Sequence, residues 1–414
     1  YRALLYRLFS AWLAQKYGSE PALIDAWGKE NLPDGQRLAK KNIDPQPNHS
    51  LFQWHFDQAH KEGRQAPRHI LDKTRFLYEQ QIAFYDRFVE AIRETGYRGV
   101  IVASCWQAGA GIAHYYNLHA DARVGMIDRH NYFGGGTGHR LVPGKVRNSA
   151  MVSRPGSGLL STGMQQVAGR PFSLSEWMSL IPNEWVAEST PLIAAYGMGL
   201  QGWDASFHFA HDHTDFTETI HSPGVYNATS PTQMGLYPAV ARMVYRGDVD
   251  EGAVISRRNV HVPSLEDGKL GFYETMKQGY DDKFMTGDVP AEALAYGRLV
   301  VDFTDDFQPT QAFDLSEWSS GAQEVIHANN GQLTWNTGGD GYFTINTPGT
   351  QGFVGFAEGR THSLSDFRLS TKNPFAVVLV TALNPGKTLA TDNRILVTTV
   401  ARARNTGMRY NEEK

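Results

Sequence analysis

The sequence predicts an α/β protein in which a parallel sheet with flanking helices is followed by an antiparallel β region. Two observations predict this fold. Up to about residue 255, short and nearly continuous apolar runs alternate with helix-forming segments, as in a parallel sheet that helices bury. Beyond that point, apolar and polar residues alternate in short runs broken by Gly, Pro, Asn and Asp. We therefore expect two domains, residues 1–255 and 256–414.

The first hundred residues are expected to be mostly helical. Residues 1–28 carry apolar side chains at helical spacing, and Gly18 divides them into two helices. Residues 29–68 are polar and rich in Pro and His, which predicts a long loop with short helical pieces. A further amphipathic helix is expected over about 69–95.

Four short apolar segments are then expected as parallel strands. They are residues 99–104, 124–128, 171–176 and 197–203. Helix-forming segments at 185–196 and 232–246 accompany them. A closed (β/α)8 barrel needs eight strands, so we interpret residues 1–255 as strands five to eight, the C-terminal half of a TIM barrel. The front half is expected to precede Tyr1.

The second domain is predicted to be an antiparallel β-sandwich. Its clearest strands are expected at residues 343–347, 352–356, 376–380 and 395–400. The sequence stops in this β-rich region without an obvious closing strand, so we expect the sandwich to be incomplete.

Composition excludes several classes of partner. With 41% hydrophobic and 20% charged residues, the chain can bury a sizeable core, and its net charge of -4 gives no electrostatic reason to expect nucleic acid. No apolar run approaches the roughly 20 residues that span a bilayer, so no membrane segment is expected. The single cysteine, Cys105, excludes an intramolecular disulfide. A secreted or periplasmic protein is favoured, although this cysteine count also fits a cytosolic one.

Polar and aromatic side chains follow or end the predicted parallel strands. In chain order they are Trp106, His130, Tyr132, Glu176, Trp203 and Asp204. Parallel barrels place their active sites at the carboxyl ends of the strands, so these side chains are expected to share one site. A carboxylate such as Glu176 can attack an anomeric carbon, Tyr or His can hydrogen-bond it, and Trp can form the floor under a sugar ring. The other five residues are expected to bind substrate.

The order of these residues resembles glycoside hydrolase clan A, the retaining (β/α)8 hydrolases. In that clan the nucleophile Glu ends strand seven, a His or Tyr follows strand six and a Trp often ends strand eight, which matches His130, Tyr132, Glu176 and Trp203. Further stretches look like large bacterial β-galactosidase-like and agarase-like members with trailing β-domains: Ser-Glu-Trp at 175–177, Pro-Asn-Glu-Trp at 182–185, Ala-Ala-Tyr-Gly at 194–197 and Gln-Gly-Trp-Asp at 201–204.

The resemblance implies double displacement on a β-linked oligo- or polysaccharide, without a cofactor. The acid/base of the clan is a Glu after an Asn at the end of strand four, which is expected upstream of Tyr1. Glu184 also follows an Asn, but it comes after the nucleophile strand, and this position argues against that role. Retention requires two carboxyl groups about 5–5.5 Å apart.

Structural roles compete with several of these assignments. The string Leu-Ser-Glu-Trp recurs at 315–318, where we interpret Glu317 as structural, so only the strand context distinguishes Glu176. Glu184 and Glu188 are expected to cap or face the following helix. The glycines of 134–138 are expected to form a loop, because no Lys follows them as a phosphate-binding loop requires.

Two other functions stay open. A carbohydrate-binding or scaffold protein without chemistry would explain the aromatic content of 12% and the β-rich region. A metal-dependent hydrolase could use the dense cluster of His208, His211, Asp212 and His213, since imidazole and carboxylate are good metal ligands. Neither the sugar, endo or exo action, nor the oligomeric state follows from the sequence.

Overall fold

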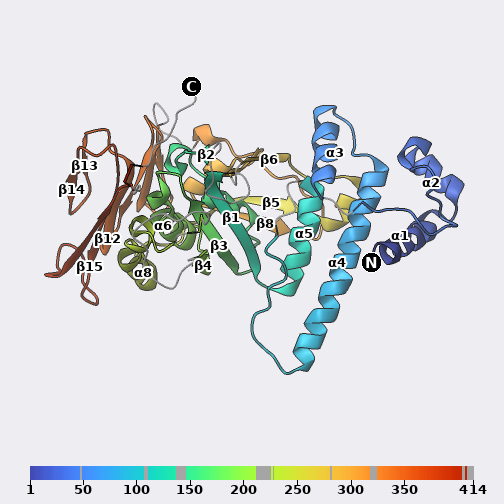
Figure 1. Cartoon of the computed structure of the whole chain (residues 1–414), viewed down its shortest axis with the longest axis horizontal. Helices are drawn as coiled ribbons and strands as arrows, with labels where there is room; N and C mark the ends of the chain where they lie inside the picture. Colours follow the sequence, from blue (N-terminus) through green and yellow to red (C-terminus); the bar gives the residue numbers. More distant parts are fainter. Residues whose placement is uncertain are drawn as a thin grey trace. The chain divides into compact units, whose positions relative to one another are not determined.

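A computed structural model describes most of the chain (Figure 1). The residues it describes are 1–46, 49–106, 111–136, 146–210, 225–226, 228–279, 282–317, 324–402 and 406–407. They divide into two compact units. Unit 1 contains Tyr1–Ile127, Asn259–Thr275 and Asp302–Thr310, and unit 2 contains Asp128–Arg258, Met276–Val301 and Gln311–Lys414. The domain boundary at residue 255 stays a prediction.

Unit 1 is mainly helical. Its helices are α1 (Arg2–Tyr17), α2 (Glu20–Trp27), α3 (His49–Lys61), α4 (Arg68–Glu94) and α5 (Gly111–Val124). Helix α1 ends at Gly18, whose φ of 74° is strained for other residues but not for glycine. Ser19 caps α2 by accepting a hydrogen bond from the backbone of Ala22. The helices predicted over 1–28 and 69–95 are confirmed.

Aromatic side chains fill the core between α1, α2 and α4. Phe9, Leu13, Trp27 and Phe76 are almost completely buried, and the ring centroids of Phe9 and Phe76 are 4.8 Å apart. Trp27 also donates its indole N–H to Asp72 at 2.7 Å, so this buried polar atom is paired. The apolar periodicity seen in the sequence therefore produces this core.

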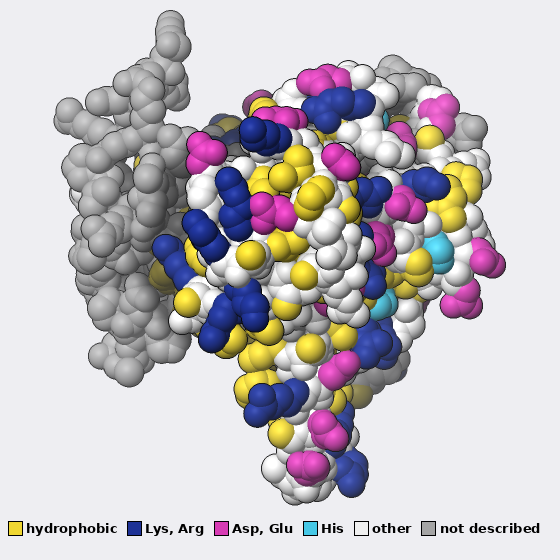
Figure 2. All heavy atoms as spheres, turned by 90° about the vertical axis from the view of Figure 1, so that its right-hand side faces the viewer, with side chains coloured by type: hydrophobic (Ala, Val, Ile, Leu, Met, Phe, Trp, Pro, Cys, Tyr) yellow, Lys and Arg dark blue, Asp and Glu magenta, His cyan; other side chains and the backbone are white. Residues whose placement is uncertain are grey.

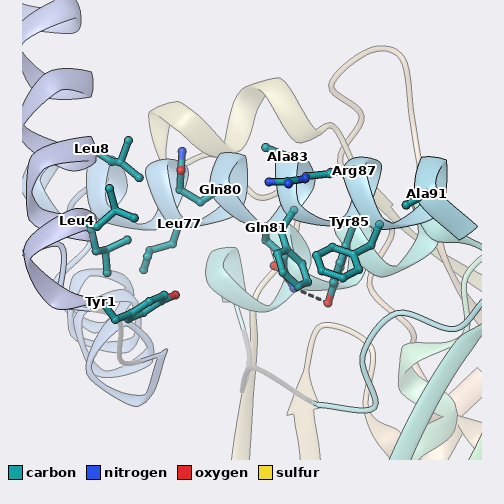
Figure 3. A pocket seen from close by; sticks show the side chains of 13 residues that line it. Tyr1, Leu4, Leu8, Leu77, Gln80, Gln81, Ala83, Tyr85, Arg87 and Ala91 are labelled. Atoms are coloured by element: carbon teal, nitrogen blue, oxygen red, sulfur yellow. Dashed lines mark hydrogen bonds between the residues drawn. The ribbon is translucent and has the colours of Figure 1, made fainter.

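A groove with a volume of about 1140 Å³ opens between α1 and α4 (Figure 3). Its lining includes large apolar side chains that remain exposed, among them Leu4, Phe84 and Phe88. Arg87 is its one charged lining residue. Figure 2 shows hydrophobic side chains at the surface on this side of the molecule, among Lys and Arg. Among the described residues that line the groove there is no carboxylate and no histidine.

The first predicted parallel strand is almost absent. Residues 99–104 contribute a single parallel bridge, between Val102 and Met126. The second predicted strand, 124–128, is displaced: helix α5 continues to Val124, and strand β1 runs over Ile127–Gly136. Because α5 and β1 are joined by two residues, the apolar run that crosses this junction belongs partly to each.

Unit 2 contains the sheet that carries most of the predicted site. Its strands lie in the order β2-β1-β3-β4. Their bounds are β1 (Ile127–Gly136), β2 (Val146–Arg147), β3 (Phe172–Leu180) and β4 (Ala205–His208). β3 and β4 are parallel, and β2 is antiparallel to β1. The predicted mixture of helices with a parallel-strand sheet is therefore confirmed.

The fourth predicted strand, 197–203, is wrong. Helix α6 (Ser189–Leu192) continues into a π-helix over Ile193–Leu200, and β4 begins only at Ala205. The segment is buried all round, and an unbroken apolar run does not distinguish a buried helix from a buried strand. A Cβ on Gly197 would lie 2.7 Å from the Trp203 ring, so the glycine permits close packing that the sequence pattern does not reveal.

The antiparallel β region forms one six-stranded sheet in the order β16-β15-β12-β11-β10-β9. Its strands are β9 (Val325–His327), β10 (Leu333–Asn336), β11 (Tyr342–Asn346), β12 (Thr350–Phe356), β15 (Phe375–Ala382) and β16 (Ile395–Val400). Trp335 and Phe343 pack against Tyr196 of the π-helix, and α8 (Tyr237–Arg246) lies along β15 (Figure 1). The antiparallel prediction is confirmed, with helices on one face of the sheet.

Three further strand pairs and one short helix belong to the described fold. They are the hairpin β13 (Thr361–Ser363) with β14 (Arg368–Ser370), the pair β5 (Val254–Val260) with β8 (Arg298–Phe303), the pair β6 (Glu274–Gly279) with β7 (Asp282–Gly287), and the short helix α7 (Pro231–Met234) that precedes α8.

Candidate active site

Strand β3 has an irregularity at the centre of the candidate site. Its register against β4 pairs Leu174 with Ser206 and Trp177 with His208. Two residues of β3, Ser175 and Glu176, therefore lie opposite one residue of β4, which is the arrangement of a β-bulge. Bulges redirect side chains and are frequent beside active sites.

The carboxylate of Glu176 accepts hydrogen bonds from a neighbouring strand. The hydroxyl of Tyr132, on β1, donates to Oε2 at 2.6 Å. Nδ1 of His130, two residues earlier on β1, lies 3.1 Å from the same oxygen. The side chains of His130 and Glu176 are 28% and 31% exposed, so they are oriented by the protein and still accessible to a ligand. The structure thus brings together three of the six predicted site residues.

The other ring nitrogen of His130 contacts the residue next to Glu176. Nε2 lies 3.0 Å from Oγ of Ser175. In a regular strand successive side chains point to opposite faces, so Ser175 and Glu176 would not both reach one imidazole. The bulge in β3 explains how two consecutive residues hold both nitrogens of the ring.

Ser175 is held in turn by a buried carboxylate at the start of β1. Asp128 accepts the hydroxyl of Ser175 on Oδ2 at 2.6 Å and its backbone N–H on Oδ1 at 3.1 Å. The hydroxyl of Ser173 donates to Oδ1 at 2.5 Å. Asp128 is only 6% exposed. It was absent from the sequence-based site, although it is the last residue of the predicted strand 124–128, because the sequence alone does not show which side chains it holds.

Two further aromatic rings lie beside Tyr132. The ring centroids of Phe209 and Tyr226 are 6.0 and 5.7 Å from that of Tyr132, and 5.0 Å from each other. Sequence reasoning missed both residues. Phe209 directly follows β4, so a correct placement of this strand would have identified it.

A stacked pair of rings joins β3 to β4. The rings of Trp177 and His208 are 4.2 Å apart and tilted by only 4°. Nδ1 of His208 lies 2.9 Å from the hydroxyl of Tyr237, and burial lowers the pKa of this imidazole to about 3. His208 is therefore neutral near neutral pH and packed into the fold.

The predicted metal cluster lies only partly within the described residues. His211, Asp212 and His213 lie outside the described residues, whereas His208 belongs to the stack with Trp177. Within the described part of the chain, no three His, Cys, Asp or Glu side chains are grouped so that they could hold a metal ion.

Trp203 and Asp204 are not brought to Glu176. Both precede β4, at the amino end of the β3–β4 pair. Asp204 accepts the backbone N–H of Phe172 at 2.8 Å, and the buried indole of Trp203 donates to Gln166 at 2.5 Å. The bulge lies opposite residue 207 of β4. This position is four residues, or roughly 13 Å of extended chain, beyond Trp203. The remaining predicted residue, Trp106, belongs to unit 1 and is 60% exposed there.

The two other glutamates of this region bind the segment that precedes β3. Glu184 accepts a hydrogen bond from Asn148 at 2.9 Å and pairs with Arg402 at 3.1 Å. Glu188 is fully buried and accepts the backbone N–H groups of Met151 and Val152 at 2.6 and 3.1 Å. Burial raises the pKa of Glu188 to about 8, although these two hydrogen bonds oppose the shift.

Two predicted features fall partly outside the described residues. Gly134, Gly135 and Gly136 continue β1 instead of forming a loop, and residues 137 and 138 are not described. In the repeated string at 315–318, residues Leu315–Glu317 form a short 3-10 helix, and residue 318 is not described. The same four letters therefore stand in a strand at Glu176 and in a helical turn at Glu317.

Comparison of the chain with protein-family models, curated proteins and solved structures found no significant match. In the part of the chain that the structure describes, no helix combines the length and the hydropathy needed to cross a membrane.

Proposed function

We propose that this chain is a retaining glycoside hydrolase that acts on β-linked oligo- or polysaccharide, with Glu176 as its nucleophile. The observation that carries the proposal is the partly exposed carboxylate of Glu176, which Tyr132 and His130 hold from the neighbouring strand. Phe209 and Tyr226 supply aromatic surface beside Tyr132, which suits the apolar face of a sugar ring.

The hydrogen bonds suggest which oxygen attacks. Tyr132 and His130 both contact Oε2 of Glu176, so Oε1 is the oxygen that would bond to the anomeric carbon. Attack forms a glycosyl ester and releases the leaving group, and water then hydrolyses the ester. Hydrogen bonds to Oε2 fix the carboxylate in one orientation, which reduces the entropy lost on reaching the transition state.

The chain order of these residues supports the same proposal. His130 and Tyr132 precede Glu176 on the neighbouring strand, as in glycoside hydrolase clan A, which this sequence resembles. A (β/α)8 barrel with strands β1, β3 and β4 as its last three strands belongs to the proposal, as does a β-sandwich behind it. We place Phe209, rather than Trp203, in the aromatic wall of the site, because Phe209 follows the carboxyl end of β4.

Trapping of the glycosyl ester tests the proposal. A 2-deoxy-2-fluoro glycosyl fluoride forms the ester when Oε1 bonds to the anomeric carbon and fluoride leaves. Because fluoride leaves without protonation, the test does not depend on the acid/base residue. We expect a member of a panel of gluco-, galacto- and xylo-configured reagents to label the peptide that contains Glu176, as read by mass spectrometry.

Two variants make the labelling specific. Glu176→Gln should abolish both labelling and the release of reducing ends from β-linked polysaccharide, while oligosaccharide binding persists. Glu317→Gln is the matched control, because Glu317 stands in the same Leu-Ser-Glu-Trp string, and it should label as the wild type does. Saturable binding without labelling or product would instead support a carbohydrate-binding or scaffold protein.

A further inference from the structure

We propose that Asp128 and Ser175 are positioning residues that fix the protonation of His130, so that its Nε2 always carries a proton and its Nδ1 shares one proton with Glu176. The role in turnover rests on the proposed function. The protonation pattern does not, because it follows from hydrogen-bond geometry in the free protein.

Asp128 determines the direction of the first hydrogen bond. Three donors surround its carboxylate: the hydroxyl of Ser173, the hydroxyl of Ser175 and the backbone N–H of Ser175. A backbone N–H can only donate, and an ionised carboxylate can only accept. The one hydroxyl hydrogen of Ser175 is thus directed to Oδ2 of Asp128, at 2.6 Å.

Ser175 then determines the state of the imidazole. Its hydroxyl hydrogen is used by Asp128, so Oγ can only accept in its 3.0 Å contact with Nε2 of His130. Nε2 must carry the hydrogen of that bond. In a neutral imidazole this leaves Nδ1 as an acceptor, and the ring then has one fixed tautomer.

The fixed tautomer has a consequence at Glu176. Two lone pairs would face each other across the 3.1 Å between Nδ1 and Oε2 unless a proton lies between them. The pair can hold it as imidazolium with carboxylate or as imidazole with carboxylic acid. In both arrangements Oε2 also accepts a hydrogen bond from the hydroxyl of Tyr132. Oε2 therefore remains hydrogen-bonded, and Oε1 keeps its orientation.

Among the described residues, the titratable groups of this hydrogen-bond network and the imidazole on the next strand come from β1, β3 and β4. Asp128 and Tyr132 belong to β1, Glu176 belongs to β3, and His208 on β4 stacks on Trp177. Tyr132 donates a hydrogen bond to Glu176 of the pair, whereas Asp128 reaches His130 only through Ser175. Burial holds His208 neutral, so it adds no charge to the pair near neutral pH.

The test is ¹⁵N NMR of the free protein with labelled histidine, recorded across the pH range in which it is folded. In the wild type, Nε2 of His130 should give the shift of a protonated nitrogen throughout this range. In Asp128→Asn the new side-chain amide can donate to Oγ of Ser175, which frees the serine hydroxyl to donate to Nε2. We expect the ring to reverse its tautomer, with Nε2 unprotonated and the hydrogen on Nδ1.

Two serine variants separate positioning from general disruption. Ser175→Ala removes the contact to Nε2, and the His130 signals should then show a mixture of tautomers. Ser173→Ala also removes a hydrogen bond to Asp128 but leaves the Ser175 contact, so its spectrum should match the wild type. Unprotonated Nε2 in the wild type, an unchanged spectrum in Asp128→Asn, or equal spectra for both serine variants would overturn the proposal.

Kinetics then measure the effect on the reaction. In metal sites, loss of a group that orients a metal-binding side chain costs roughly 10–100-fold, and we take the same scale for a group that orients the partner of the nucleophile. We expect Ser175→Ala to lower kcat by about that factor with little change in KM, whereas Ser173→Ala keeps wild-type kcat. If the spectra behave as expected but no glycoside labels Glu176, the proposed function fails and the protonation pattern stands. If a glycoside labels Glu176 but the spectra do not show the expected tautomers, only this inference fails.

Discussion

The hydroxyl of Tyr132 donates a hydrogen bond of 2.6 Å to Oε2 of Glu176, across the boundary between the neighbouring strands β1 and β3. A hydrogen bond to a charged acceptor is roughly twice as strong as one between neutral groups. In Tyr132→Phe the carboxylate loses this donor, and we expect kcat/KM to fall by about 100-fold. The control is Tyr237→Phe, because the Tyr237 hydroxyl contacts His208 instead. Equal rates for the two variants would contradict the role of Tyr132.

Substitutions of the aromatic residues near β4 should distinguish a ligand-binding role, at Phe209, from a structural role, at Trp203. Phe209→Ala removes a ring beside Tyr132, and we expect about 10-fold weaker oligosaccharide binding, within the range of one aromatic contact. Trp203→Phe should bind as the wild type does but lose about 1–3 kcal/mol of stability, because Oε1 of the buried Gln166 loses its donor. Calorimetric titration of each change in a Glu176→Gln background, with urea unfolding, measures both. Weaker binding in Trp203→Phe alone would restore the sequence-based assignment.

The buried carboxyl of Glu188 should make stability fall as pH rises. Its pKa is raised by burial from 4.5 to about 8, so between these values only the unfolded chain ionises there. The free energy of unfolding should therefore decrease by up to about 1.4 kcal/mol per pH unit in this window, and the contribution is fully present below 4.5.

Glu188→Gln tests this pH dependence. The variant cannot ionise, so its free energy of unfolding should change less steeply between pH 4.5 and 8 than that of the wild type. One of the backbone N–H groups of Met151 and Val152 loses its acceptor, which should cost about 1–3 kcal/mol at the acid end. Glu358→Gln, at an exposed carboxylate, is the control. Parallel pH profiles for wild type and Glu188→Gln would disprove the assignment.

The same substitution, Phe→Ala, can be made at a buried and at an exposed position of helix α4. Phe76 is 1% exposed in the core with Phe9, whereas Phe84 is 56% exposed in the groove beside α1. Phe76→Ala should cost about 3–5 kcal/mol of stability through lost packing and a cavity. Phe84→Ala should stay within about 0.5 kcal/mol, as surface changes usually do. Denaturant unfolding of both variants checks the prediction, and a large loss for Phe84→Ala would show that its ring is covered in solution.

The success of sequence reasoning depended on the periodicity of each segment. Helices α1 and α4 were predicted because their apolar side chains recur at helical spacing, and strands β11, β12, β15 and β16 because short runs are bounded by Gly, Pro, Asn and Asp. The π-helix over Ile193–Leu200 was mistaken for a strand because it is buried all round and has no polar face. That error moved the expected strand end to Trp203, so Phe209 was overlooked.

At the candidate site, sequence order identified the carboxylate and its partners but not the network behind them. Glu176, His130 and Tyr132 stood out because titratable and aromatic side chains are unusual at the ends of buried strands. Asp128 and Ser175 were missed for a different reason. Their role depends on the bulge in β3, and a bulge is a feature of the pairing between strands that one strand's sequence does not encode.

At the bulge in β3, the number of residues is a stricter requirement than their identity. If either Ser175 or Glu176 were deleted, regular pairing with β4 would be restored, with Trp177 still opposite His208 and a single residue opposite residue 207. Only one side chain of β3 would then remain at this place, and no substitution elsewhere could return two consecutive side chains to one imidazole. An engineered or related sequence can therefore tolerate exchanges around Glu176 more readily than the insertion or loss of a single residue.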